Sequence, residues 1–215
     1  MSGVADELEA IAAGIREHWQ AKYQAREKAL ANGRDVIRNS ANAIRAVHRG
    51  ELATAEQLLA RARTLLDETE AALQGHADIY YAGFVEDAQK EYAEGSITLA
   101  LVDGRPLPSN AALNVSAAAY LNGAAEAVGE LRRVVLDQLR QGHTERCEPL
   151  LTAMDDIYGV LVTMDFPDGM TGGLRRSTDN TRGILERTRG DLTMALVQRG
   201  VQERWERLGD ALGNG

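Results

Sequence analysis

The chain has 215 residues, of which 44% are hydrophobic, and its 24 basic and 32 acidic side chains give a formal net charge of −8. This length predicts one domain over residues 1–215 with a sizeable core. The negative charge argues against unspecific binding of nucleic acid over the whole surface, and it suits a site for a hard divalent cation. Because no apolar run is long enough to span a bilayer and the acidic start lacks the basic region of a targeting peptide, we expect a soluble, cytoplasmic protein without membrane association.

Helical periodicity dominates the first half of the chain, and strand signals are nearly absent. The first predicted helix covers about residues 8–47, with apolar residues every three to four positions, and ends at an arginine followed by a glycine. A second helix is predicted over 51–73 and a third over about 78–101. The cluster of glycine, proline, serine and asparagine that follows, at 103–110, predicts a loop.

Three further helices are predicted in the second half. The first covers 116–141, with Ser116 as its N-cap. The next covers about 144–164 and is broken by the proline and glycine of 165–169, and the last covers about 173–207 with a candidate stop at Gly200. The economical fold is therefore an all-α bundle of six or seven helices.

The first helix carries a stripe of arginines beside its apolar seam. At about 100° per residue, these side chains fall within about 60° of one another. They are Arg34, Arg38, Arg45 and Arg49. The stripe is either a solvated face, because basic side chains commonly flank a core seam, or a set of phosphate contacts, because guanidinium groups suit phosphate oxygens.

Two predicted helices each carry a pair of glutamates on one face. Glu91 and Glu94 are three residues apart, and Glu126 and Glu130 are four apart. Like charges at these spacings are mildly destabilising, which indicates a partner or a purpose. If the two helices meet, four carboxylates can bind one or two Mg²⁺ ions, which activate water and stabilise charge in phosphoryl transfer. The alternatives are a face that meets a partner subunit for the first pair and a salt bridge to Arg133 for the second.

The other chemistry-bearing residues give weaker signals. Gly123 and Gly129 each cost about 1 kcal/mol relative to alanine inside a helix, which is tolerated most easily where another backbone or a ligand comes close. No histidine follows a glutamate at the spacing of di-iron carboxylate bundles, and no phosphate-loop or zinc motif occurs. We interpret His48 as a packed or interfacial residue rather than a catalyst. Cys147 is alone, so it cannot form a disulfide within one chain.

Several segments resemble the translin and Trax family, and together they cover most of the chain. They are GRDVIRNSANAIRAVHRGE, DAQKEYAEGSITLAL, YLNGAAEAVGELRR, MDDIYGVL and LRRSTDNTRGILERTRGDL. The third segment is the most specific, because it carries the pattern YL-x-G-x-x-(acid)-x-x-GEL-x-R. The resemblance implies a seven-helix, translin-like protomer that assembles into an octameric shell and binds single-stranded nucleic acid inside it.

The resemblance also implies roles for the glutamates. Trax subunits cut RNA with Mg²⁺, whereas translin subunits mainly bind it. The Trax catalytic acids lie in an E-x-x-E pattern and in the YL-x-G segment, and the matching positions here are Glu91, Glu94, Glu126 and Glu130. Glu126 stands where Trax commonly has aspartate. The segment ahead of E-x-x-E, rich in arginine and histidine in translin, holds three acids and only Lys90 here, so it is more similar to Trax.

The leading hypothesis is therefore a Mg²⁺-dependent endoribonuclease, with Mn²⁺ as a substitute ion, that acts on single-stranded RNA inside a homo-oligomer, expected to be an octamer. The rival hypothesis is a non-catalytic protein of the translin type that holds single-stranded RNA or DNA in such a shell, with its acids serving as salt bridges between helices. A third hypothesis is a scaffold with a protein partner.

Overall fold

The computed structural model describes the backbone of residues 3–213 and the side chains of residues 3–209. Within this range it contains helices and no strand, which confirms the all-α prediction. The six long helices are α1 (Val4–His48), α2 (Leu52–Ala72), α4 (Phe84–Val102), α6 (Ala117–Arg140), α7 (Cys147–Val162) and α9 (Leu174–Gly213). The short ones are α3 (Ala77–Tyr80), α5 (Asn110–Leu113), the 3-10 helix η1 (Thr144–Arg146) and α8 (Asp168–Thr171). None of these described helices combines the length and the apolar character that crossing a membrane requires.

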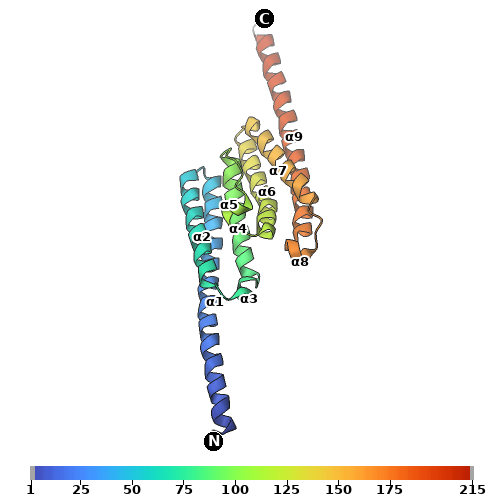
Figure 1. Ribbon diagram of the computed structural model, residues 1–215. Coiled ribbons are helices and arrows are strands. Elements are labelled where there is room, and N and C mark those ends of the chain that lie inside the picture. Colours follow the sequence, from blue (N-terminus) through green and yellow to red (C-terminus); the bar gives the residue numbers. More distant parts are fainter. Residues whose placement is uncertain (1–2, 214–215) are drawn as a thin grey trace.

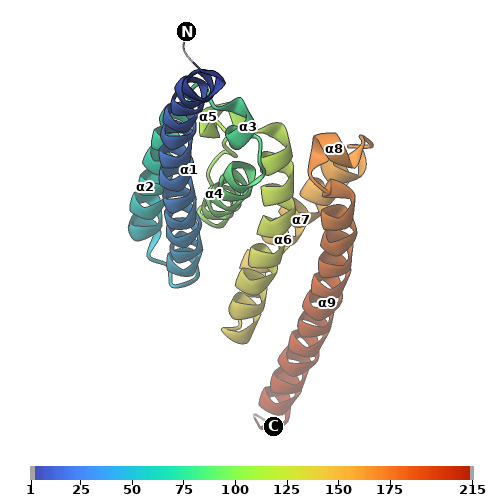
Figure 2. The ribbon, with the colours of Figure 1, turned by 90° about the horizontal axis from the view of Figure 1, so that it is seen from below.

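The long helices form a bundle with α4 and α6 at its centre (Figures 1 and 2). α1 packs along α2 and α4, while α6 packs between α4 and the pair formed by α7 and α9. The first part of α1 and the last part of α9 project beyond the other helices at opposite ends of the molecule (Figure 1). The central pair of helices is therefore the place where the two halves of the bundle meet.

Each half of the bundle has its own apolar core. The core under α1, α2 and α4 is built from residues such as Val36, Leu59, Leu66 and Tyr92. The core between α6, α7 and α9 includes Val128, Leu131, Met154 and Leu192. The single cysteine, Cys147, is fully buried in this second core as a free thiol, and burial raises its pKa.

One predicted helix is two helices in the structure. The prediction of a continuous helix over 78–101 was wrong, because α3 ends at Tyr80 and α4 begins at Phe84. Gly83, between them, has a φ of +98°, which L-residues with a side chain rarely adopt. Tyr80 therefore does not lie on the helix that carries Glu91. Two further differences are that α9 continues through Gly200 and that the predicted break at 165–169 contains the start of α8.

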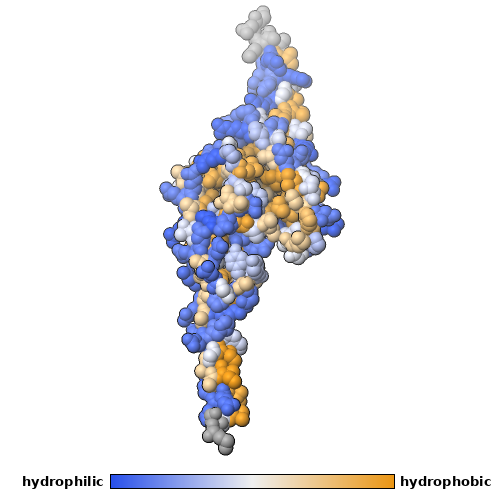
Figure 3. All heavy atoms as spheres, in the orientation of Figure 1, coloured by the Kyte–Doolittle hydropathy of each residue, from blue (hydrophilic) through white to orange (hydrophobic). Residues whose placement is uncertain are grey.

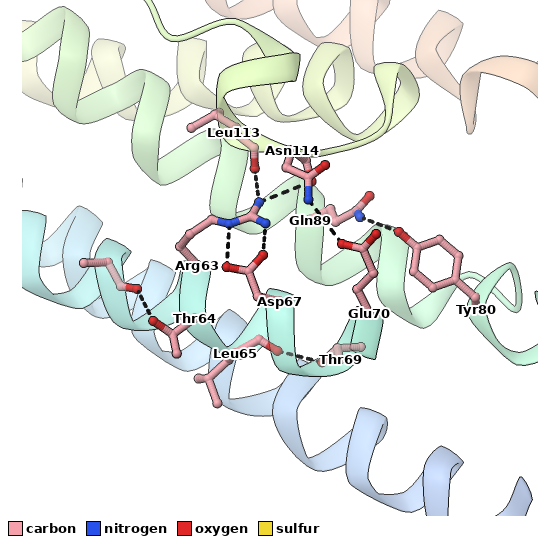
Figure 4. Close-up of polar contacts among 11 residues, drawn as sticks. Arg63, Thr64, Leu65, Asp67, Thr69, Glu70, Tyr80, Gln89, Leu113 and Asn114 are labelled. Atoms are coloured by element: carbon pink, nitrogen blue, oxygen red, sulfur yellow. Dashed lines mark hydrogen bonds and ion pairs between the residues drawn. The ribbon is translucent and has the colours of Figure 1, made fainter. Parts of the chain in front are cut away.

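Polar contacts fasten the turn before α6 to α2 (Figure 4). The Arg63 guanidinium pairs with Asp67 and donates to the carbonyl oxygens of Leu113 and Asn114, at 3.3 Å for the latter. The side-chain amide of Asn114 in turn donates to Glu70 at 3.2 Å. These contacts fix the point at which the chain enters α6.

The first turn of α6 is also held to α4. The Gln89 amide oxygen accepts a hydrogen bond from the backbone N–H of Ser116 at 3.1 Å, and its amide nitrogen donates to the Tyr80 hydroxyl at 3.3 Å. The Ser116 hydroxyl accepts from the N–H of Ala119 at 3.0 Å, which confirms the predicted N-cap. Because Gln89 lies just before Glu91 on α4, these bonds set how α6 is aligned with the glutamates of α4.

Apolar side chains are exposed on both projecting ends (Figure 3). We call these two sets, which lie on α1 and on α9, the apolar ends. Their members are between 45% and 73% exposed and are Val4, Leu8, Ile11, Ile15 and Trp19 on α1, with Met194, Val197, Val201, Trp205 and Leu208 on α9. Their spacing of three to four residues places each set on one helical face. The seam predicted for the first helix thus continues beyond the core of the protomer.

Candidate metal centre

A glycine allows α6 to approach α4 closely. A Cβ built on Gly123 would lie 2.7 Å from the carbonyl oxygen of Lys90 and 2.9 Å from the nitrogen of Glu94. Any larger residue at this position must push the two helices apart. The expected approach of another backbone is therefore found at Gly123 but not at Gly129, whose built Cβ makes only an ordinary contact of 3.9 Å with Ile184.

This approach brings together three of the four predicted site glutamates. Glu91 and Glu94 from α4 and Glu126 from α6 each place a carboxylate oxygen within 4.8 Å of the others. Opposite oxygen ligands around Mg²⁺ are about 4.2 Å apart, so small side-chain rotations suffice to place these oxygens around one ion. We call these three residues the carboxylate cluster.

Glu94 is the most enclosed member of the carboxylate cluster, with 8% of its surface exposed. Burial, followed by the charges of Glu126, Glu91 and Glu130, raises its pKa to about 8. Burial also raises the pKa of Glu91, against the opposing charge of Lys90. Because a buried carboxylate without a cationic or hydrogen-bonding partner is unfavourable, the cluster fits a divalent cation, which its oxygens can coordinate.

Lys90 supplies a positive charge beside the carboxylate cluster. Its ammonium donates to Oε1 of Glu126 at 2.8 Å and lies 3.6 Å from Oε1 of Glu91. Burial lowers its pKa, but the hydrogen bond to Glu126 and the nearby carboxylates outweigh that effect, and the pKa is raised overall. The side chain is therefore a cation at neutral pH.

Glu130 lies one turn beyond Glu126 and has a different partner. Its Oε2 is 2.5 Å from Nε2 of His48, whose side chain is only 5% exposed. The hydrogen bond from His48 lowers the pKa of Glu130, and the charge of Arg133 adds a smaller effect in the same direction. Glu130 therefore stands beside the cluster as a carboxylate held by α1, and its charge still acts on Glu94.

The contact of His48 with Glu130 was missed by sequence reasoning. His48 is packed, as expected, yet it packs against the candidate site. The two residues are 82 positions apart, and no local spacing relates them. The available signal was the place of His48 at the edge of the apolar seam of the first predicted helix.

A polar groove begins at Glu126. A cavity of about 330 Å³, lined by Lys90, Asn122 and Glu126, shares Glu126, Gly172 and Ser177 with a second cavity of about 680 Å³. We call the two together the Glu126 groove. Asn122 ties its walls together, because its amide nitrogen donates to the carbonyl oxygen of Thr171 at 2.7 Å and its amide oxygen accepts from the Ser177 hydroxyl at 2.8 Å.

The Glu126 groove contains two arginines that were not predicted as site residues. Arg175 and Arg176, in the first turn of α9, line its second cavity together with Asp168 and Asp179. Neither guanidinium makes a hydrogen bond or ion pair with any residue that the structure describes. The groove thus offers unpaired cationic groups close to the carboxylate cluster.

The predicted arginine stripe lies elsewhere, on the exposed surface of α1 and at the residue that follows its C-terminus. Arg34, Arg38, Arg45 and Arg49 are exposed, and none of them lines the Glu126 groove. Three of the four have polar neighbours. Arg38 is 2.9 Å from Asp35, Arg45 is 2.8 Å from Asn42, and Arg49 is 2.7 Å from Glu51. The structure therefore does not bring the stripe together with the carboxylate cluster.

The fold and the site describe an all-helical protein whose two central helices gather glutamates at one end of a polar groove. AfC3PO, solved in complex with duplex RNA, superimposes on it with a TM-score of 0.82 and 34% sequence identity, covering 87% of this chain and 97% of that chain. The chain therefore belongs to the C3PO (translin/Trax) family.

Two further proteins are less similar to this chain in sequence. The apo form of NeC3PO superimposes with a TM-score of 0.76 over 91% of this chain and 98% of that chain, and at 18% identity it supports the fold. An uncharacterized protein of Methanocaldococcus jannaschii is 25% identical over 188 residues, which is 87% of this chain and 83% of the relative. No family model matches the sequence.

Proposed function

We propose that this chain is a Trax-like, Mg²⁺-dependent endoribonuclease that cuts single-stranded RNA within a homo-oligomeric, octameric shell in the cytoplasm. The observation that carries the proposal is the convergence of Glu91, Glu94 and Glu126 on one point at the contact of α4 and α6. These three side chains would hold the ion, with Mn²⁺ as a substitute. When bound, the ion supplies an activated water and neutralises charge that develops on a phosphate.

The chain's own residues contribute the surroundings of that chemistry. Glu130, fixed by His48, adds a negative charge that strengthens the attraction of the cluster for a cation. Arg175 and Arg176 offer guanidinium groups to phosphate oxygens along the Glu126 groove. The relative AfC3PO was solved with duplex RNA, which supports RNA as the class of ligand and makes a duplex the natural competitor in a binding assay.

The apolar ends support assembly from copies of one chain. Ten large apolar side chains exposed on two projecting helices are an unfavourable surface for a monomer, because such contiguous patches mark interaction sites. Packing of the ends of one protomer against neighbouring protomers would bury them. Multi-angle light scattering measures the mass of the particle, and a monomer at working concentrations would remove the shell model.

The test of the catalytic assignment uses Glu91→Gln and Glu126→Gln, alone and together. Each single change should lower Mg²⁺-dependent cleavage of labelled single-stranded RNA by roughly two orders of magnitude, because it removes a charged ligand of the ion. The double change should be hardly worse than either single one, since residues that act as a unit are not additive. Retained binding of intact RNA is expected in all three.

Glu68→Gln is the matched control, because Glu68 is an exposed carboxylate on α2 that belongs to neither the carboxylate cluster nor the lining of the Glu126 groove. It should cleave at the parent rate with Mg²⁺, and a chelator should stop its cleavage as it stops that of the parent. If Glu91→Gln and Glu126→Gln stay assembled and also cleave at the parent rate, the carboxylate cluster is not the catalytic site. Retention of intact RNA that does not depend on the metal would favour the rival, a non-catalytic binding protein.

A further inference from the structure

Lysine is rare in this chain, and one of the few is placed at the carboxylate cluster. Lys22 and Lys28 lie on α1, whereas Lys90 precedes Glu91 directly on α4. Its ammonium is 2.8 Å from one oxygen of Glu126 and 3.6 Å from one oxygen of Glu91. Lys90 thus touches two of the three glutamates that would hold the ion.

The same side chain also faces the place where RNA would lie. Among the residues that the structure describes, Lys90 is the one basic side chain that lines the first cavity of the Glu126 groove, and the other polar side chains of its lining are Glu86, Asp87, Asn122, Glu126 and Ser177. The side chain of Lys90 is 26% exposed, so it is not sealed inside the bundle. It therefore stands between the carboxylate cluster and the groove.

We propose that Lys90 exchanges partners during function: it neutralises Glu126 and Glu91 while the metal is absent, and it binds a phosphate of the RNA in the Glu126 groove once the metal has taken its place. This inference rests on the proposed metal site and adds to it a residue that controls loading of the ion and binding of the substrate.

Electrostatic repulsion supports such an exchange. A divalent ion held by Glu126 and Glu91 would stand close to the ammonium that those oxygens now contact, and like charges at such distances repel strongly in a partly buried site. A lysine side chain has four rotatable bonds and can move its ammonium by several ångströms. Lys90 already lines the Glu126 groove, and a phosphate oxygen there would replace the lost carboxylate.

Two measurements on the full-length protein test the two halves of the exchange. In the first, the EPR signal of free Mn²⁺ gives the affinity of the RNA-free protein for the metal. Lys90→Met should bind Mn²⁺ about tenfold more tightly than the parent, because the ion no longer displaces a cation. Lys90→Arg, which keeps the charge, should not bind more tightly.

In the second measurement, single-turnover cleavage of a labelled single-stranded RNA is followed at saturating Mg²⁺, where differences in metal affinity no longer matter. Lys90→Met should cleave about tenfold more slowly or bind the RNA about tenfold more weakly, since one charge-assisted contact is missing. A residue with a purely structural role would weaken both the metal and the RNA, so the opposite signs identify the exchange. Lys28→Met makes the same chemical change at an exposed position and should alter neither.

The outcomes separate this inference from the proposed function. If Glu94→Gln leaves Mn²⁺ affinity unchanged, the metal site itself is wrong. If Glu94→Gln weakens Mn²⁺ binding but Lys90→Met does not strengthen it, the metal site stands and the exchange is overturned. Tighter Mn²⁺ binding with unchanged RNA affinity and cleavage at saturating Mg²⁺ would also overturn it, because the phosphate contact would be absent.

Discussion

Glu94 shows how burial prepares a side chain for a metal. It is enclosed between α4 and α6, and it lies near three other carboxylates, so its proton is held to unusually high pH. A group of this kind is neutral when no ion is present, and it becomes a ligand only when the gain from coordination exceeds the cost of losing the proton. The metal site is therefore coupled to pH, most strongly through Glu94 and in the same direction through Glu91.

The raised pKa gives a prediction with a definite sign. Because the folded protein keeps the Glu94 proton up to about pH 8, whereas the unfolded chain releases it near the ordinary value of 4.5, this group stabilises the metal-free fold fully below pH 4.5. That stabilisation is lost as the pH rises from about 4.5 through about 8, at about 1.4 kcal/mol per pH unit, and the loss levels off above that value. Thermal unfolding of the chelated protein from pH 5 to 9 should show the loss, and Glu94→Gln should remove that part of it.

Mn²⁺ affinity should follow the opposite course. It should rise with pH up to about 8 and then level off, because the metal must displace the Glu94 proton below that value. An affinity that is flat between pH 6 and 8 would show that Glu94 is either already ionised or not a ligand.

The contact between α4 and α6 depends on one missing methyl group. The backbone of α4 at Lys90 and Glu94 occupies the space where a side chain at position 123 would lie. Glu126 follows Gly123 by one helical turn, so the separation of the two helices at this point sets the distance between Glu126 and the glutamates of α4. The geometry of the candidate site is thus a property of helix packing as well as of the acids themselves.

Two glycine substitutions on α6 should have opposite effects. Gly123→Ala places a methyl group 2.7 Å from a carbonyl oxygen, so we expect a loss of about 1–3 kcal/mol of unfolding free energy and weaker Mn²⁺ binding. Gly129→Ala meets nothing closer than 3.9 Å, so the helix propensity of alanine should stabilise the protein by up to about 1 kcal/mol. Chemical denaturation of both variants gives the comparison. Equal effects of the two changes would show that α6 can shift away from α4 without cost.

Sequence periodicity and spacing go far in this protein, because most of its structure is local. The long helices, the Ser116 cap and the one-faced spacing of the glutamate pairs are all set by residues within a few turns of one another. The pairing of His48 with Glu130 and the fit of Gly123 against Lys90 depend on which helices are neighbours, and no local pattern encodes that. The break at Gly83 was missed because apolar periodicity continues on both sides of it.

The protomer as a whole is acidic, with a net charge of −8, yet it is proposed to hold RNA. Binding must therefore depend on local groups of arginines that outweigh a repulsive background, and salt will screen both. Two such groups are present, the exposed stripe on α1 and the pair Arg175 and Arg176 in the Glu126 groove. The apolar ends bear on the same point, because assembly decides which of these surfaces faces the interior of a shell.

Two double variants compare the arginine groups. We expect Arg34→Gln with Arg38→Gln, and Arg175→Gln with Arg176→Gln, each to weaken RNA affinity and to reduce its dependence on the logarithm of salt concentration by roughly one unit for each lost phosphate contact. Fluorescence anisotropy at several salt concentrations measures both quantities. Unchanged affinity of the first variant throughout would return the α1 stripe to a solvated face, and the same result for the second would remove Arg175 and Arg176 from the RNA path.

The buried cysteine makes local opening of the fold measurable by thiol labelling. Because Cys147 is fully buried and the sequence contains no other cysteine, a thiol reagent can label the chain only when α7 separates from its neighbours. The labelling rate under native conditions therefore reports the opening equilibrium of the half of the bundle formed by α6, α7 and α9. A metal that joins α4 to α6 stabilises one edge of that half, so the slowing of alkylation on adding Mg²⁺ would measure how far the effect of the ion travels through the fold.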